Sequence, residues 1–160
     1  ICAAVALAAA SSAQADVVFR NVRDNGFFTP FHASTSSAVR YGDSGWFGSG
    51  SDAPVELESI TLGLAVYNST RAGSTDVTFT FNDGDPSGLV FGPGTTLYST
   101  TVHNVALDNT GAGGVSFFDL TIALPGVHTS GGFNNIGFSI GVSNFDSDGS
   151  VGFQIGRAHV

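Results

Sequence analysis

The sequence has a single cysteine, Cys2, and neither lysine nor methionine. One cysteine cannot form a disulfide within the chain, and it cannot build a site of several thiolates around a metal. Cys2 also lies in an apolar run near the N-terminus that we expect to be removed, so the mature chain has no thiol nucleophile. The fold must therefore be held by apolar burial, and a domain of roughly 140 residues is large enough for that.

Basic residues are also scarce. Thirteen acidic side chains stand against five basic ones, all arginine, which gives a formal net charge of −8 at pH 7. Such a field repels the phosphates of nucleic acids and anionic membrane surfaces. We therefore expect no nucleic-acid partner and no membrane contact by the folded domain. The low charge density suits an exported protein that is kept soluble by neutral polar groups.

The two ends of the chain differ from the rest. Residues 1–10 form an alanine-rich apolar run, too short to span a bilayer as a helix, and small residues follow it up to Ala15. Small side chains at Ala13 and Ala15 fit signal peptidase, so we interpret residues 1–15 as a partial Sec-type signal peptide; the alternative is a short core helix. Residues 155–160 resemble the in-frame translation of a sequencing adapter. We expect a non-native tail there, with an ordinary strand end as the alternative.

Residues 16–154 carry an apolar–polar alternation with a period of two. In the run 77–81 every odd residue is apolar and every even residue is threonine. One buried face and one wet face are typical of an antiparallel sheet. Clusters of Gly, Asn and Asp between the runs predict turns. The pattern predicts a single all-β domain, an antiparallel β-sandwich of jelly-roll type. Strands are expected at residues 17–22, 37–41, 55–67, 75–82, 95–105, 115–124, 135–142 and 150–154.

Patterns that indicate catalysis are weak. His32, His103 and His128 are scattered along the chain, and we interpret each as a surface histidine. The sequence contains no HExxH pair, and its GxSxG match at residues 137–141 lies inside an expected strand, not on the strand-to-helix turn of a nucleophile elbow. Glu56 and Glu58 share one face of an expected strand, a spacing more typical of a wet strand face than of a glycosidase pair. We therefore expect a protein that is not an enzyme and has no cofactor other than weakly held calcium.

A calcium site is the sharper hypothesis. Asp83, Asp85 and Ser87 place oxygen ligands at the first, third and fifth positions of a loop, and Gly88 follows them. Hard cations favour this arrangement, but the twelfth position lacks the bidentate glutamate of a complete cage. A second, shorter acidic turn covers residues 146–149. The alternative is that both segments are plain turns whose acidic side chains only shape the backbone.

An aromatic pair supplies a third candidate site. Tyr41 and Trp46 adjoin the glycine- and serine-rich stretch 42–54, the least regular connection in the sequence. Exposed aromatic rings stack well on the apolar faces of sugar rings. The alternative is a loop that folds its tryptophan over one end of the sandwich. An exposed Trp46 coplanar with Tyr41 would favour sugar binding, whereas a buried Trp46 would favour a structural role.

Several turn motifs resemble those of one family of exported proteins. The run FTFNDGDPSG at residues 79–88 is followed by PGTTLYS at residues 93–99, and FDLT and LPGV follow at residues 118–121 and 124–127. Together with the signal peptide, these motifs resemble bacterial proteins of the PEP-CTERM or choice-of-anchor type. The resemblance implies a β-sandwich that is sorted to the cell surface or into exopolysaccharide. It also implies a C-terminal anchor beyond Gln154, and it carries over no catalytic residues.

Two functions from different classes follow. The preferred one is a non-catalytic structural or interaction domain of a bacterial cell surface or biofilm matrix, with exopolysaccharide or another matrix component as its partner. The alternative is a carbohydrate-binding module, aided by calcium. In both cases we expect the protein to be secreted or held at the cell surface.

Overall fold

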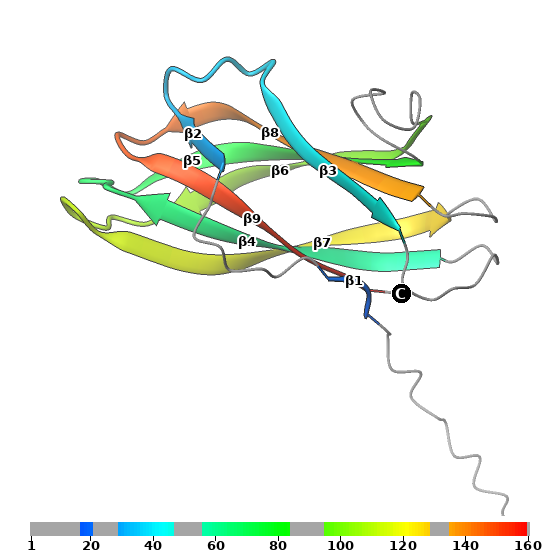
Figure 1. Ribbon diagram of the computed structural model, residues 1–160. Coiled ribbons are helices and arrows are strands. Elements are labelled where there is room, and N and C mark those ends of the chain that lie inside the picture. The colour runs from blue at the N-terminus through cyan, green and yellow to red at the C-terminus, as the bar shows by residue number, and fades with distance from the viewer. Residues whose placement is uncertain (1–16, 21–28, 47–55, 84–94, 129–134, 160) are drawn as a thin grey trace, which may run out of the picture.

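The computed structural model describes residues 17–20, 29–46, 56–83, 95–128 and 135–159, and all regular structure in these ranges is β-strand. Within the same ranges, no helix is long and apolar enough to cross a membrane. Two antiparallel sheets lie face to face (Figure 1). The strands are β1 (Val17–Arg20), β2 (Thr29–His32), β3 (Arg40–Trp46), β4 (Glu56–Tyr67), β5 (Gly73–Asp83), β6 (Thr95–Leu107), β7 (Val115–His128), β8 (Asn135–Asp146) and β9 (Ser150–His159).

The connectivity is that of a jelly roll. The first sheet has the order β1-β9-β4-β7, with β2 also paired to β9, and the second sheet has the order β3-β8-β5-β6. The pairs β2–β9, β3–β8, β4–β7 and β5–β6 are nested, as when one long hairpin is wrapped around itself. The chain is therefore an antiparallel β-sandwich of jelly-roll type, which confirms the fold class predicted from the alternation.

Strand β2 was not predicted. It reads TPFH, contains Pro30 and has no alternation to reveal it. Proline lacks the N–H that an inner strand needs, but it is tolerated at a sheet edge, and among the described strands β2 pairs only with β9. The prediction was also wrong for residues 42–46, which were assigned to an irregular stretch. They belong to β3, whose pairing with β8 is unbroken from Arg40 to Trp46.

The ends of the chain bear on two other expectations. The proposed signal peptide, residues 1–15, lies outside the described residues, and β1 begins at Val17. Strand β9 continues to His159 and pairs with β1 and β4 as far as that residue. The backbone of residues 155–159 is therefore part of the first sheet. Their origin as a non-native tail stays a prediction from the sequence.

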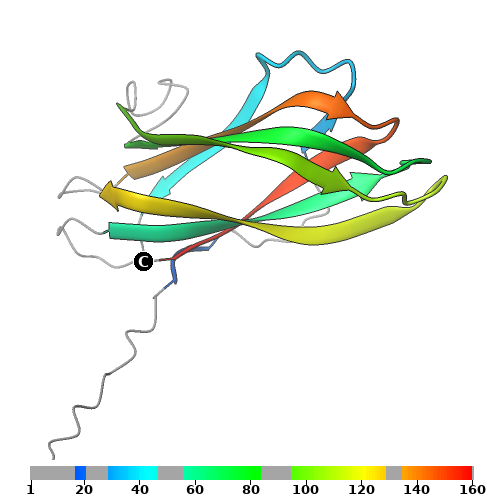
Figure 2. The ribbon, with the colours of Figure 1, turned by 180° about the vertical axis from the view of Figure 1, so that it is seen from behind.

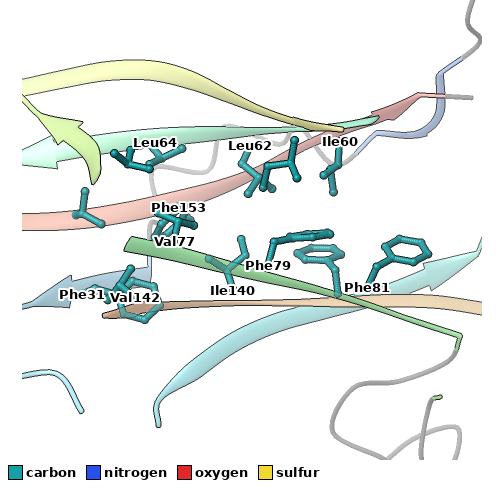
Figure 3. Close-up of a cluster of buried hydrophobic side chains, with 14 of the residues drawn as sticks. Phe31, Ile60, Leu62, Leu64, Val77, Phe79, Phe81, Ile140, Val142 and Phe153 are labelled. Carbon is teal, nitrogen blue, oxygen red and sulfur yellow. The ribbon is translucent and has the colours of Figure 1, made fainter. Parts of the chain in front are cut away.

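The core lies between the sheets and follows the alternation. Val77, Phe79 and Phe81 are fully buried, whereas Thr78 and Thr80 between them are half-buried on the outer face. The ring of Phe79 stacks on Phe81 and on Phe138 of β8, with centroids 6.4 and 6.0 Å away. Figure 3 shows the rings of Phe79 and Phe81 facing aliphatic side chains of β4 in the opposite sheet, namely Ile60, Leu62 and Leu64.

We expect Phe79→Ala to lower the free energy of unfolding by about 3–5 kcal/mol, because it removes a fully buried ring and leaves a cavity between the sheets. Chemical denaturation followed by circular dichroism measures this loss. Phe117→Ala is the matched control, since 66% of Phe117 is exposed. An equal loss in both variants would contradict this account of the core.

Candidate functional site

The two aromatic residues predicted to bind sugar lie at opposite ends of β3. Tyr41 pairs with Ile140 and Trp46 with Asn135, in a register without interruption. Five residues of extended strand separate their Cα atoms by about 17 Å. An odd separation also assigns the two positions to opposite faces of the sheet. The structure therefore does not bring Tyr41 and Trp46 together into one stacking platform.

Tyr41 has a structural contact of its own. Its ring meets the buried ring of Phe31 edge-on, with centroids 4.9 Å apart and an interplanar angle of 74°. Because Phe31 belongs to the first sheet and Tyr41 to the second, this contact closes one side of the sandwich. Tyr41 stays 39% exposed. The side chain of Trp46 lies outside the described side chains. The choice between sugar binding and a structural role, which depends on whether Trp46 is exposed, therefore stays a prediction.

The predicted calcium turn begins at the last residue of β5. Asp83 pairs with Ile136 of β8 and with Thr95 of β6, while Asp85 and Ser87 lie outside the described residues. Since Trp46 pairs with Asn135, Asp83 and Trp46 flank the start of β8 from either side. Two strand spacings separate them, about 10 Å. The fold thus brings two candidate features, far apart in the sequence, to the same end of the second sheet.

Asn82, which was not singled out in the sequence, lies at this same end. Its side-chain nitrogen donates to Thr96 Oγ1 at 3.3 Å, but its Oδ1 atom is buried without a hydrogen-bond partner. A buried acceptor left in this way is costly, and a water molecule or a cation would satisfy it. The described residues contain no group of three or more His, Cys, Asp or Glu side chains placed to hold a metal ion.

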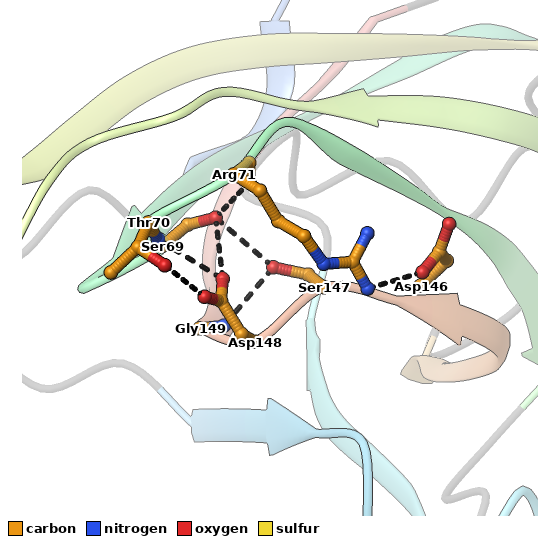
Figure 4. A network of polar contacts seen from close by, with 7 residues as sticks. All are labelled: Ser69, Thr70, Arg71, Asp146, Ser147, Asp148 and Gly149. Atoms are coloured by element: carbon orange, nitrogen blue, oxygen red, sulfur yellow. Dashed lines mark hydrogen bonds and ion pairs between the residues drawn. The ribbon is translucent and has the colours of Figure 1, made fainter.

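The second acidic turn is engaged in structural contacts (Figure 4). Asp148 Oδ1 accepts from the Thr70 backbone N–H at 3.0 Å and from Ser69 Oγ at 3.2 Å, and its other oxygen accepts from the Thr70 hydroxyl. Arg71 forms an ion pair with Asp146. These contacts lower the pKa of both carboxyl groups, that of Asp148 mainly through the Thr70 hydroxyl and that of Asp146 mainly through Arg71. This turn therefore fits the plain-turn alternative.

The same contacts join three loops at this end of the sandwich. The backbone N–H groups of Thr110 and Gly111 donate to the Ser69 carbonyl at 2.9 and 2.7 Å. Gly149 is packed so closely that a Cβ atom there would lie 2.4 Å from the Tyr67 carbonyl oxygen. The polar side chains at this end hold the β4–β5, β6–β7 and β8–β9 loops together, and they leave few groups for a ligand.

The outer face of the second sheet carries paired hydroxyl groups. Thr78 bonds to Thr101 at 2.9 Å and Thr80 bonds to Ser99 at 3.1 Å, each pair directly opposite across β5 and β6. On the other side of β5, the positions paired with residues 78, 80 and 82 are Gly141, Ser139 and Gly137. This central part of the face is therefore rich in hydroxyl groups, and the charged Arg40 side chain packs beside them, over Gly141.

Asp76 forms a buried polar hub at the far end of this face. Its carboxylate accepts from the Asn104 backbone N–H at 2.9 Å, from His103 Nδ1 at 2.9 Å and from Asn144 Nδ2 at 2.7 Å. The register shifts on both sides of Asp76, and Asn104 and Asn144 have positive φ angles of 55° and 49°. Asparagine tolerates this backbone region better than most residues. Asp76 thus stabilises the irregular backbone of both neighbouring strands, β6 and β8.

The contact with Asp76 determines which ring nitrogen of His103 carries a proton. The Asn104 N–H, followed by the His103 and Asn144 side chains, lowers the pKa of Asp76 to about 2, so this carboxylate only accepts. His103 Nδ1 must then carry the donated proton, and Nε2 faces away from Asp76. The His103 side chain is 67% exposed, as expected for a surface histidine, but the bond to Asp76 was not foreseen. The two residues are 27 positions apart in the sequence, so no local sequence pattern predicts their contact.

One serine–histidine contact exists among the described residues. Ser34 Oγ lies 2.8 Å from His32 Nδ1 in the exposed turn after β2. A nucleophilic serine also needs a group that orients the histidine and donors that stabilise an oxyanion. The contact is between residues two apart in an exposed turn, and no such third group is bonded to His32 in the described part of the chain. Glu56, which pairs with His128 across β4 and β7, is likewise exposed.

Comparison with known proteins identifies no relative by sequence, since no family model and no curated protein match the chain. Two solved structures are similar in fold. A carbohydrate-binding module, CBM27-1 of Caldicellulosiruptor saccharolyticus in complex with mannohexaose, has 12% identity and a TM-score of 0.37 over 76% of this chain and 65% of its own. The infectious bursal disease virus Gx strain has 16% identity and a TM-score of 0.32 over 99% and 37%. At these values neither structure informs the function of this chain.

We expect Asp76→Asn to lower the melting temperature at neutral pH, because an amide cannot accept from all three donors. Since the pKa of Asp76 is about 2 in the folded chain and 3.8 ordinarily, its stabilising contribution is complete above about pH 4. It is lost as pH falls through 2. The difference in melting temperature between wild type and variant should therefore shrink in acid. Asp119→Asn, an exposed site, controls for net charge, and a difference independent of pH would contradict the assignment.

For the turn at Asp83 we expect folding without calcium and little gain on adding it. A site with millimolar affinity, held at tenfold excess of ion over Kd, would stabilise the fold by roughly 1.4 kcal/mol, a shift of a few degrees. Thermal melts in chelator and in excess CaCl₂ measure this, with Asp83→Asn/Asp85→Asn as control. A wild type that unfolds in chelator, beside a double variant that ignores calcium, would prove a true structural site.

Proposed function

We propose that this chain is the folded domain of an exported, non-catalytic protein of a bacterial cell surface or extracellular matrix. Three features of the sequence support export: the leader-like residues 1–15, the lack of cysteine beyond Cys2, and the resemblance of residues 79–88 and 93–99 to PEP-CTERM-type proteins. In the described part of the chain, His32, His103 and the acidic groups of residues 146–148 take part in turns, irregularities of the strands and loop contacts. That use of polar groups favours an interaction domain over an enzyme.

The hydroxyl-rich outer face of the second sheet carries the proposal. An acidic chain repels anionic polymers, so a partner contacted over a broad surface is more readily an uncharged one. Hydroxyl groups at Thr78, Thr80, Ser99 and Thr101 offer both donors and acceptors to the hydroxyls of a neutral polysaccharide. Successive pairs repeat about every 6.6 Å along the strands. We therefore propose a neutral, polyhydroxylated matrix polymer as the partner of this face.

A binding module for short sugar chains is the second candidate. It is favoured by one observation, the position of Trp46, which the register with Asn135 assigns to the outer face of the second sheet. Stacking on an aromatic ring at this position, with hydrogen bonds to the outer-face hydroxyl groups, would suit a short sugar chain, whereas Asp83, opposite Ile136, belongs to the other face of the sheet. Tyr41 is not part of this arrangement, because it packs on Phe31 at the other end of β3.

The test is retention of the purified chain on insoluble polysaccharides, with an unsubstituted neutral glucan compared with a uronic-acid polymer. We expect binding to the neutral polymer and not to the anionic one. Ser99→Glu/Thr101→Glu, which puts two charges on the outer face, should weaken binding about tenfold or more. Trp46→Ala separates the candidates, since a short-chain site at that end should lose binding and a broad face should lose little.

The matched control is Ser37→Glu/Ala38→Glu, which adds the same charge on the exposed turn before β3. This control should bind like wild type, with circular dichroism confirming that each variant folds. Equal loss in both double variants would mean that net charge, not the outer face, governs binding. Failure of the wild type to bind any neutral polymer would overturn the proposal.

A further inference from the structure

Strand β7 is the longest regular edge of the sandwich. It ends the order of the first sheet, and no other described strand pairs on its outer side. Its register with β4 is continuous from Val115 to Ala123 and shifts at residues 124–126, which form a bulge between the pairs Ser59–Ala123 and Leu57–Val127. Figure 2 shows β7 beside β6, the edge of the other sheet, on the side facing the viewer. Strand β6 has two register shifts along its length, so it is the less regular edge.

The usual protections of an edge strand are missing from this segment. Soluble proteins guard such edges with lysine, proline, bulges or inward charges. The chain has no lysine, and the nine residues from Val115 to Ala123 contain no proline, no bulge and one charge, Asp119. The described residues expose three large apolar side chains, and two of them, Val115 at 46% and Phe117 at 66%, lie on this segment. An open backbone ladder with apolar neighbours is chemically complementary to another β-strand.

We propose that β7 pairs antiparallel with β7 of a second copy of this chain, joining the first sheets of two molecules across a twofold axis. In such a symmetric pair, opposite residues share a face and are equidistant from the axis. An axis at Asp119 would set two carboxylates against each other, which destabilises a strand pair. An axis at Leu120 avoids this and uses the whole of residues 117–123. It sets Asp119 opposite Thr121, Phe117 opposite Ala123, and Phe118 opposite Ile122.

Packing favours the same register. Phe118 and Leu120 point toward the core but are only half-buried, because nothing in the described part of the chain flanks β7 on that side. A second β7 would cover both. An axis at Phe118 would instead set Phe117 against Asp119, an apolar ring against a charge. The bulge at Pro125 ends the pairing one residue beyond Ala123, so the paired segment has a defined length.

The experiment measures the mass of the full chain by sedimentation or light scattering across a concentration series, with reducing agent to silence Cys2. We expect a dimer of twice 16.3 kDa that strengthens with salt, since each copy carries a net charge of −8. Thr121→Asp places a carboxylate opposite Asp119 at two symmetric positions and should weaken the dimer about fivefold or more. Thr121→Lys places a cation there and should keep or tighten it.

The two variants control for each other, since both remove the hydroxyl that bonds to Thr61 at 3.0 Å. Ser99→Asp is the matched control on β6, because Ser99 is also an exposed hydroxyl bonded to a threonine, Thr80, at 3.1 Å. This control should not change the dimer. A chain that stays monomeric at every concentration and salt, a dimer indifferent to the sign of charge at residue 121, or equal weakening by Ser99→Asp would each overturn the proposal.

Discussion

The burial of one side of every long strand between the two sheets is the constraint on which the rest of the structure depends. No disulfide can assist it, because the chain has one cysteine. The inward ring of Phe79 stacks on Phe81 and Phe138, and the strand pleat then forces Thr78 and Thr80 outward. Because β5 and β6 are in register, those threonines meet hydroxyls on the next strand. The hydroxyl-rich outer face is thus a direct consequence of the phenylalanine core.

Asp76 allows the sheet to depart from that regularity. The second sheet has a register shift on each side of this residue, and Asn104 and Asn144 adopt positive φ angles beside it. The Asp76 side chain is itself buried, so its carboxylate needs hydrogen-bond donors, and the two irregular strands supply them. A single carboxylate satisfies the Asn104 backbone and the His103 and Asn144 side chains at once. An acid in the middle of a strand is therefore a structural element here, although it presents an oriented histidine to solvent.

The two ends of the sandwich differ in what their polar groups do. At one end, Ser69 and Asp148 bind three loops to one another, so their oxygens are occupied within the protein. At the other end, Asn82 Oδ1 has no partner, and Trp46 and Asp83 flank the start of β8. This contrast directs the search for a ligand to the second end and to the hydroxyl-rich face beside it. The acidic turn at residues 146–149 resembles a metal-binding motif, but its carboxylates are engaged in contacts within the protein.

The sequence by itself determined the all-β class, the buried face of each long strand and the first residues of most strands, because a period of two is local information that burial enforces. It did not reveal β2, whose proline and lack of alternation hide a short edge strand. Only the tertiary structure decided which distant residues meet. It joined Asp76 to His103 and Asn144, separated Tyr41 from Trp46, and placed Trp46 and Asp83 at one end of the second sheet but on opposite faces. Those outcomes depend on strand order and register. Both arise from the packing of the two sheets together, so the local sequence of a single strand does not predict them.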